Sequence, residues 1–172
     1  WLSVVGILYG GFMALAQTDL KRLVAYSSVS HMGFVTLGIF SFNSEGIGGA
    51  ILQMVTHGLT TGAMFLIVGQ LYDRTHSREI ADYGGLQQRM PKFVAILSLF
   101  AVASFGLPTT SNFIGEFLIL VGVSSVNFIF VVLAMGGIVL GAAYMLWMLQ
   151  RVALGEARTE TAKQLVDLSP RE

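Results

Sequence analysis

Long apolar stretches separated by short polar connections follow one another along the chain. Each is 17 residues or longer, and a helix needs about 20 mainly apolar residues to cross the ~30 Å hydrocarbon layer of a bilayer. Strands of membrane barrels are shorter, about 10 residues, and alternate apolar with polar positions. The pattern therefore predicts five transmembrane helices, the first of them cut by the start of the sequence, over residues 1–17, 23–42, 46–72, 93–122 and 126–150.

The fourth stretch contains its own interruption. As one straight helix, its 30 residues would be about 45 Å long, well beyond the hydrocarbon layer. Pro108 lacks a backbone donor and disfavours helical geometry at the residue before it, while Thr110, Ser111 and Asn112 are good caps for a new helix. We expect a discontinuous helix broken around residues 107–112. Transporters use such breaks to build ion sites.

Composition and charge narrow the class of protein further. Hydrophobic residues make up 54% of the 172 residues and charged residues only 12%, about half the usual share. Glu116 is the only charged residue between Lys92 and Arg151. The fold class is therefore an all-α polytopic membrane protein, with a transmembrane bundle over residues 1–151 and a polar cytoplasmic segment over 152–172.

The charge balance and the absence of cysteine exclude several functions. Ten basic and ten acidic residues give no basic surface for a nucleic-acid partner. Without cysteine the chain has no disulfide, thiolate metal centre or iron–sulfur cluster, so we expect no cofactor in it. Any redox centre must belong to another chain.

Basic residues between the predicted helices fall on alternate connections, which predicts the orientation. By the positive-inside rule these connections are cytoplasmic, so the first helix runs inward and the fifth ends inside. The basic residues follow the first, third and fifth helices. In that order they are Lys21 and Arg22, then Arg74, Arg78, Arg89 and Lys92, and then Arg151, Arg158 and Lys163.

Glu116 is the first candidate for chemistry. It follows the break and is expected in the first turn of the second half-helix, where the helix dipole favours the carboxylate while burial favours the neutral acid. A carboxyl group under these opposing influences can take up and release a proton. The structural alternative is that Glu116 caps the half-helix or pairs with a cation, but a carboxyl group inside a membrane is costly and more often functional.

The third predicted helix has one polar face, which we expect to turn inward. The residues on it recur at helical spacing and are Gln53, Thr56, His57, Thr60 and Thr61. His57 lies near the middle of the bilayer, and imidazole exchanges protons near neutral pH. The second helix repeats this pattern more weakly, with Ser27, Ser30 and His31, and with Lys21 at its inner end. A histidine that only bonds across a helix interface, and a lysine that only anchors the helix at the membrane surface, are the structural alternatives.

Glycines spaced four residues apart occur in three of the helices. Such pairs let helix backbones approach closely, so we expect helix contacts there. The pairs are Gly6 and Gly10, Gly58 and Gly62, and Gly137 and Gly141.

Four segments resemble one known family. They are QTDLKRLVAYSSVSHMG (17–33), QMVTHGL (53–59), YDRTHSR (72–78) and NFIGEF (112–117). They are similar to the M subunits of bacterial proton-translocating NADH:quinone oxidoreductase, respiratory complex I, which correspond to subunit 4 of mitochondria and chloroplasts. The first segment is shared with the wider antiporter-like superfamily, whereas the third and fourth are typical of these subunits.

The resemblance implies a fourteen-helix subunit of the bacterial inner membrane, of which this chain is the second of two inverted five-helix repeats. It implies partners, namely the other membrane subunits and the peripheral subunits that hold flavin and iron–sulfur clusters, in a translocase driven by quinone reduction. No redox chemistry is expected in this chain. The residues that match the family's proton pathway are Glu116, His57, His31 and Lys21.

Two other functions remain open at this point. A subunit of a multisubunit sodium/proton antiporter shares the fold and the first segment, but usually carries Lys where Glu116 stands. A structural membrane scaffold would use its polar residues only to pack helices. The partners separate these hypotheses, because only a complex I subunit copurifies with flavin and iron–sulfur subunits.

Overall fold

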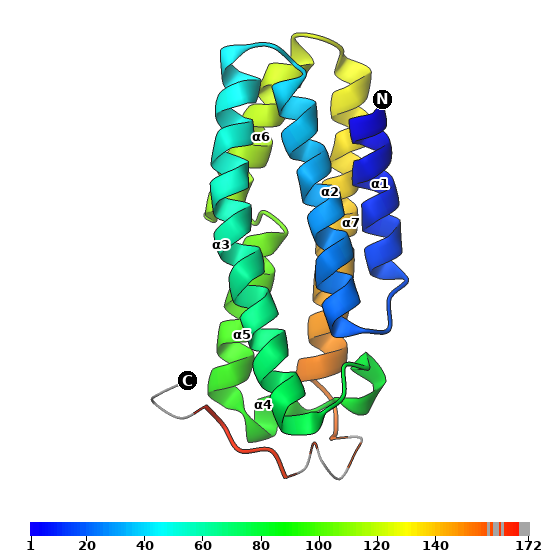
Figure 1. The fold of residues 1–172 in the computed structure, drawn as a ribbon, viewed down its shortest axis with the longest axis vertical. Coiled ribbons are helices and arrows are strands. Elements are labelled where there is room, and N and C mark those ends of the chain that lie inside the picture. The colour runs from blue at the N-terminus through cyan, green and yellow to red at the C-terminus, as the bar shows by residue number, and fades with distance from the viewer. Residues whose placement is uncertain (158, 160–161, 163, 169–172) are drawn as a thin grey trace.

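The computed structural model describes residues 1–157, 159, 162 and 164–168, and in this part of the chain the regular structure is helical. Figure 1 shows the helices running up and down an elongated bundle. The elements are α1 (Leu2–Leu15), α2 (Leu20–Ile39), α3 (Ser44–Thr75), a 3-10 turn η1 (Ile80–Asp82), α4 (Leu86–Arg89), α5 (Pro91–Ser104), α6 (Ser111–Ser124) and α7 (Phe128–Ala153).

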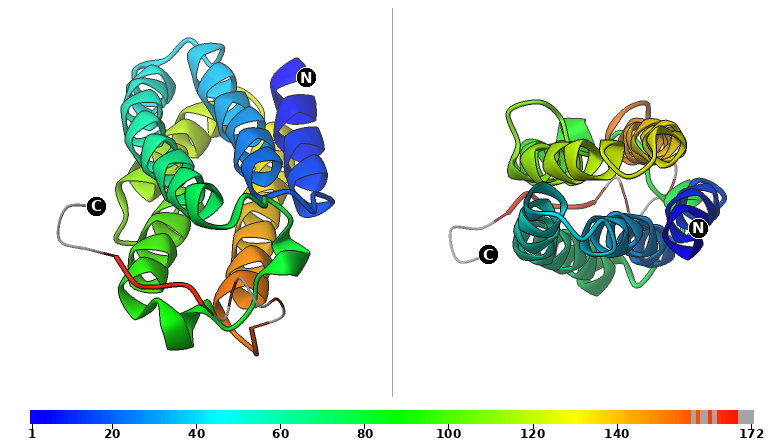
Figure 2. Two further views of the ribbon diagram at one scale, coloured as in Figure 1. Left: turned by 60° about the horizontal axis from the view of Figure 1, so that its bottom comes forward. Right: turned by 90° about the horizontal axis from the view of Figure 1, so that it is seen from above.

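The helices form two layers. Seen from above, α1, α2 and α3 lie side by side in one layer, and α6 and α7 lie in the other (Figure 2). Helix α3 packs against both α5 and α6, while α1 packs against α2 and α7. This arrangement brings the polar face of α3 to the centre, opposite the break between α5 and α6.

The predicted discontinuous helix is confirmed. Helix α5 ends at Ser104 and α6 begins at Ser111 on the same side of the bundle, so the two halves stack end to end (Figure 1). The prediction that the residues after Pro108 cap α6 through their side chains is wrong. The N-cap residue, Thr110, makes no capping bond, because its hydroxyl donates to the Leu107 carbonyl at 2.8 Å.

Two helices of the described residues, α3 and α7, are long and apolar enough to cross a membrane by themselves. Helices α1, α5 and α6 have 14 residues each, and α5 and α6 cover the length of the bundle only together. The predicted third and fifth spans thus correspond to α3 and α7, and the predicted fourth span to the pair of half-helices.

Two clusters of buried apolar side chains fill the bundle, one at each end. The basal cluster lies between the lower halves of the helices and includes Val24, Met64, Leu97 and Met148. The apical cluster is smaller and consists of Val4, Ile7, Phe34, Leu37, Ile119, Val123, Val131 and Ala134. Helices α1, α2 and α7 each contribute to both clusters, so each crosses the level that separates them.

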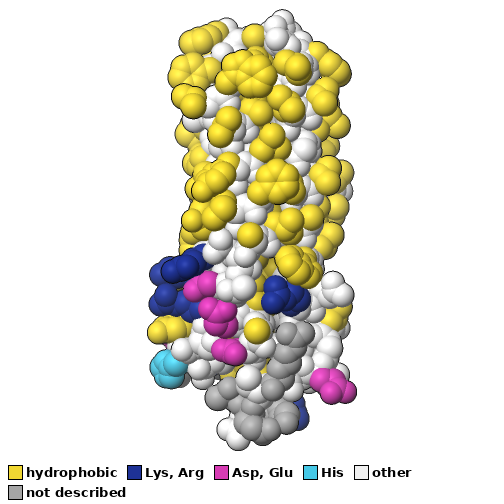
Figure 3. Space-filling model, turned by 90° about the vertical axis from the view of Figure 1, so that its right-hand side faces the viewer, with side chains coloured by type: hydrophobic (Ala, Val, Ile, Leu, Met, Phe, Trp, Pro, Cys, Tyr) yellow, Lys and Arg dark blue, Asp and Glu magenta, His cyan; other side chains and the backbone are white. Residues whose placement is uncertain are grey.

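Charged side chains gather at the basal end, below a surface that is almost wholly apolar (Figure 3). The connection from α1 to α2, the one from α3 to α5 and the end of α7 all lie there (Figure 1), as the alternation of basic residues requires. Of the basic residues in the predicted pattern, Arg158 and Lys163 lie outside the described residues. Which side of a membrane this end faces stays a prediction.

Described residues of the 152–172 segment contact the basal end of the bundle. Leu165 and Leu168 pack against the basal cluster. The Asp167 carboxylate accepts hydrogen bonds from the backbone N–H groups of Lys92 and Phe93, at 3.0 and 3.1 Å. These N–H groups belong to the first turn of α5, so Asp167 caps that helix from a distant part of the sequence.

The close helix contacts predicted at the glycine pairs are present at some of these glycines and absent at others. A Cβ atom on Gly10 would lie 2.7 Å from the Ser30 backbone N, so α1 and α2 approach closely there, and a Cβ atom on Gly137 would overlap the Ile7 side chain. The prediction is wrong for Gly58 and Gly62, where a Cβ atom would meet nothing within 4 Å. These two glycines lie on the outer face of α3, because its polar face takes the inward side.

Candidate functional site

Most of the buried polar side chains form one layer between the two apolar clusters. In α2 the order along the helix is basal Val24, then polar His31, then apical Phe34, and hydrogen bonds join polar residues of α3, α5 and α6 at this level. We call it the polar layer. Its members are all buried and come from α2, α3, α5 and α6, namely Ser27, Ser30, His31, Gln53, Thr56, His57, Thr60, Ser104, Asn112 and Glu116.

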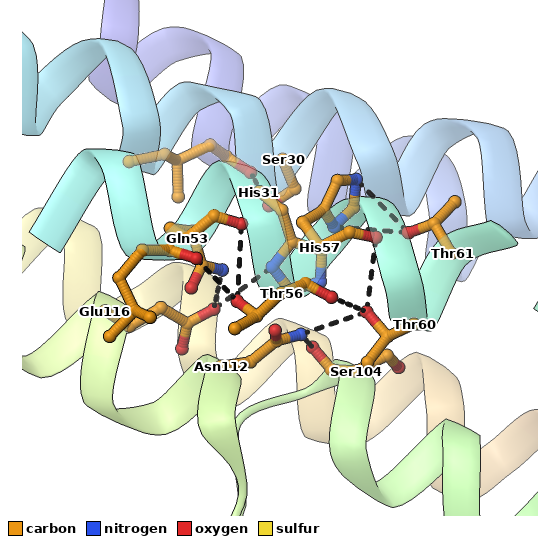
Figure 4. A network of polar contacts seen from close by, with 12 residues as sticks. Ser30, His31, Gln53, Thr56, His57, Thr60, Thr61, Ser104, Asn112 and Glu116 are labelled. Atoms are coloured by element: carbon orange, nitrogen blue, oxygen red, sulfur yellow. Dashed lines mark hydrogen bonds and ion pairs between the residues drawn. The ribbon is translucent and has the colours of Figure 1, made fainter. Parts of the chain in front are cut away.

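Glu116 lies at the centre of the layer and is 2% exposed. Its Oε1 atom lies 3.1 Å from His31 Nδ1 and accepts a hydrogen bond from Gln53 Nε2 at 3.2 Å (Figure 4). The prediction that Glu116 stands in the first turn of the second half-helix is wrong. Helix α6 begins at Ser111, so Glu116 is in its second turn, and side chains of α2 and α3, more than the helix terminus, set its surroundings.

The backbone of the break lies directly against this carboxyl group. Gly106 has a φ of +73°, a conformation that side chains other than glycine rarely adopt. A Cβ atom at this position would come within 2.6 Å of Glu116 Oε2. Glycine at position 106 therefore permits both the turn of the chain and the close approach of the carboxylate.

His31 connects three neighbours. Its Nδ1 faces Glu116, and its Nε2 lies 3.4 Å from the Tyr144 hydroxyl of α7. The ring centroid lies 5.2 Å from that of His57. A neutral imidazole carries a proton on one nitrogen only, so His31 donates to one of its two bonded neighbours and accepts from the other. When protonated it would donate to both and form an ion pair with Glu116.

His57 extends the polar layer along α3. Its ring lies 3.2 Å from the Thr61 hydroxyl, one turn further along the helix (Figure 4). The Thr60 hydroxyl donates to the Thr56 carbonyl at 3.0 Å and accepts from Asn112 Nδ2 at 3.3 Å. Asn112 thus joins α6 to the polar face of α3, instead of capping its own helix.

Two buried amide oxygens in the layer, Gln53 Oε1 and Asn112 Oδ1, accept no hydrogen bond from the described residues. An amide oxygen without a partner is costly in an apolar interior, and ordered water is the usual partner for such groups. Both side chains also donate within the layer. The layer therefore has acceptor sites suited to water beside both Glu116 and Thr60.

The structure brings most of the predicted site residues together, but not all of them. Glu116, His31, His57, Gln53, Thr56 and Thr60 all lie in the layer. Pro108 is exposed at the break between α5 and α6. Lys21 is exposed at the basal end, ten residues or about 15 Å along α2 from His31, and has no contact with the layer. Its membership of the proton pathway stays a prediction.

Sequence reasoning missed Tyr144. This side chain is fully buried in the basal cluster, and its hydroxyl reaches His31. The available signal was its position in α7, three residues after Gly141 and seven after Gly137, on the face that the glycines turn inward. A buried tyrosine hydroxyl usually finds a hydrogen-bond partner, but this signal does not say which helix supplies it.

The arrangement suits the transfer of protons. Three groups that can carry one, two imidazoles and a carboxyl group, form a row in which neighbours are in contact, and the row is shielded from solvent. Among the described residues no group of three or more His, Asp or Glu side chains is arranged to hold a metal ion.

The chain is similar to a known family and to individual proteins. Residues 1–141 match the family described as NADH:quinone oxidoreductase/Mrp antiporter, transmembrane. NADH-quinone oxidoreductase subunit M of Rhodobacter capsulatus is 52% identical over 171 residues, which are 99% of this chain and 33% of that protein. NADH-ubiquinone oxidoreductase chain 4 of Arabidopsis thaliana is 49% identical, with 99% and 34% covered. The chain thus spans about a third of the length of these relatives.

Solved structures agree with this comparison. A chain of respiratory complex I from Thermus thermophilus superposes with a TM-score of 0.92 at 37% identity, over 98% of this chain and 35% of that one. A chain of the Mrp complex from a Dietzia species superposes with a TM-score of 0.85 at 23% identity, over 91% and 30%. At that identity the second likeness shows the fold alone.

Proposed function

The chain belongs to the NADH:quinone oxidoreductase/Mrp antiporter transmembrane family, and on this basis we propose that it is part of a complex I membrane subunit and carries protons through the polar layer. The observation that carries the proposal is the buried contact between His31 and Glu116 at the break of the helix, with His57 beside it. Flavin and iron–sulfur clusters would reside in partner subunits, and for the iron–sulfur clusters this agrees with the lack of cysteine ligands in the chain.

Each residue has a specific part in the proposed pathway. Glu116 accepts a proton from His31 across 3.1 Å, and Gln53 holds the carboxylate in place by its hydrogen bond to the same oxygen. His57 exchanges protons with His31 through water, because its ring touches that of His31 without a direct hydrogen bond between them. Thr56 and Thr60 keep this face of α3 polar, and Pro108 keeps the helix open beside Glu116.

The test compares two substitutions at Glu116 in the full-length subunit within its complex, in sealed membrane vesicles. Glu116→Gln keeps the shape and much of the hydrogen bonding but cannot exchange a proton, whereas Glu116→Asp keeps the acid and withdraws it by one methylene group. We expect proton translocation and coupled electron transfer to fall strongly in the first variant and less in the second. NADH oxidation by an artificial acceptor, which needs no proton path, should stay unchanged in both.

Glu45→Gln is the matched control, because Glu45 is an exposed carboxylate at the start of α3, away from the layer. An assembled Glu116→Gln variant that pumps as many protons per electron as the wild type would overturn the proposal. Purification also tests it, since the copurified subunits should contain flavin and iron–sulfur clusters. An assembly without them would identify the sodium/proton antiporter instead.

A further inference from the structure

A groove at the basal end combines two cations with an apolar floor. Its walls come from α2, α3 and the connection after α3, and its volume is about 290 Å³. The residues that line it are Lys21, Phe65, Val68, Gly69, Tyr72 and Arg78. It is separate from the centre of the polar layer, because His31 lies ten residues, or about three turns, from Lys21 along α2.

No acidic side chain in the described part of the chain neutralises these two cations. Within the described part of the chain neither Lys21 nor Arg78 forms an ion pair, although acidic residues are near in sequence. The Asp19 carboxylate accepts from the Arg22 backbone N–H, and the Asp82 carboxylate accepts from Ser77. Arg78 instead lies over the Tyr72 ring, 4.5 Å from its centroid, which fixes the guanidinium at the edge of the groove.

The position of the groove indicates what fills it. Phe65 and Gly69 are partly exposed on α3 beside the buried Val68, and the helix ends at Thr75, six residues after Gly69. In Figure 3 Lys and Arg side chains gather where the apolar surface gives way to the charged end. Basic pockets between transmembrane helices at this depth are suited to anionic lipid head groups, with the acyl chain along the apolar side.

Gly69 leaves the floor of the groove open. A Cβ atom at this position would meet nothing within 4 Å, so an acyl chain can lie against the backbone of α3 here. From the unpaired cations, the apolar floor and their place at the membrane boundary, we propose that this groove binds an anionic phospholipid, with Lys21 and Arg78 on its phosphate and the chain along Gly69. A soluble phosphate compound would use the cations but not the floor.

The test is photolabelling of the full-length subunit, within its complex, in phosphatidylcholine nanodiscs. The probe is phosphatidylglycerol with a photoreactive acyl chain, compared with equally labelled phosphatidylcholine. We expect the anionic probe to label α3 between residues 65 and 72 preferentially. Replacing Lys21 or Arg78 by Gln should weaken this labelling roughly fivefold for each charge removed.

Gly69→Leu tests the floor independently, since it keeps both charges and fills open space. It should also reduce the labelling, while the control Gly62→Leu, on the same open face and outside the groove, should not. Equal labelling by the two lipids, or labelling unchanged in Gly69→Leu, would overturn the proposal. So would competition by glycerol 3-phosphate, or a cross-link to another polypeptide in place of lipid.

Discussion

The two halves of the broken helix are held in the bundle by different means. Helix α6 touches α3 backbone to backbone. A Cβ atom on Gly49 would lie 2.7 Å from the Ile119 backbone N, and one on Gly122 would lie 2.6 Å from Gly46 Cα. Helix α5 packs through large side chains such as Phe93 and Leu97, within the basal cluster. The half that carries Glu116 is therefore fixed more closely than the half that precedes the break.

This difference shows which half of the broken helix must be positioned more exactly. A backbone contact between glycines sets the distance and rotation of two helices within a few tenths of an ångström, because no rotamer can change to relieve a misfit. Side chains in an apolar cluster can repack around a change of similar volume. Glu116 bonds to residues of α2 and α3, so its half-helix has the tighter constraint.

The largest effect is expected from Gly122→Ala. The new methyl group would meet the backbone of Gly46, which cannot move without separating α3 from α6. We expect a loss of roughly 3 kcal/mol or more in the free energy of unfolding, measured by denaturant unfolding of the full-length subunit in detergent. Leu97→Met, a change of similar volume in α5, should cost less than about 1.5 kcal/mol. Equal losses in the two variants would contradict the comparison.

A smaller loss with a local signature is expected from Gly106→Ala. The positive φ alone costs about 1–2 kcal/mol for alanine, and the methyl group would also push Glu116 Oε2 away from its position. The carboxyl stretching band of Glu116, identified by its loss in Glu116→Gln, should therefore shift in the infrared spectrum.

The substitution Gly155→Ala separates the effect of the positive φ from the effect of the contact with Glu116. Gly155 has a φ of +86° and open space around its Cβ position, so it shares the backbone strain without the contact. Its substitution should destabilise the protein and leave the Glu116 band in place. An unshifted band in Gly106→Ala would show that the carboxylate does not depend on the turn.

The sequence alone was sufficient to identify the residues that interrupt the apolar stretches. Pro108 within a long apolar stretch predicted the interruption, and Glu116, His31 and His57 were predicted because polar groups are costly in a membrane. Tyr144 and the role of Asn112 were not found, because they depend on which helix lies opposite. The rotation of α3 also decided that Gly58 and Gly62 face outward, and no local pattern contains that information.

The smallest effect concerns the start of α5 and depends on pH. Partial desolvation tends to raise the pKa of Asp167, but hydrogen bonds from the backbone N–H groups of Lys92, Leu168 and Phe93, with the Lys92 charge, lower it below the ordinary 3.8. A lowered pKa stabilises the folded state above pH 3.8, and this contribution is lost as the pH falls through the folded value.

Asp167→Asn should therefore slightly lower the melting temperature at pH 7. The difference from the wild type should begin to shrink on acidification through about pH 4 and disappear only below the lowered folded-state pKa, where Asp167 itself becomes protonated. A difference that stays constant down to pH 3 would mean that the carboxylate charge does not contribute to the cap of α5.

The two apolar clusters on either side of the polar layer have an electrical consequence. In an energised membrane, moving one elementary charge through 100 mV changes its energy by about 2.3 kcal/mol. Much of that voltage falls across the apical and basal clusters, because they are the regions of low polarisability, and little of it falls within the layer. In the proposed pathway, a proton exchanged between His31 and Glu116 would thus move at nearly constant potential, and the work against the field would be done in the steps that cross the clusters.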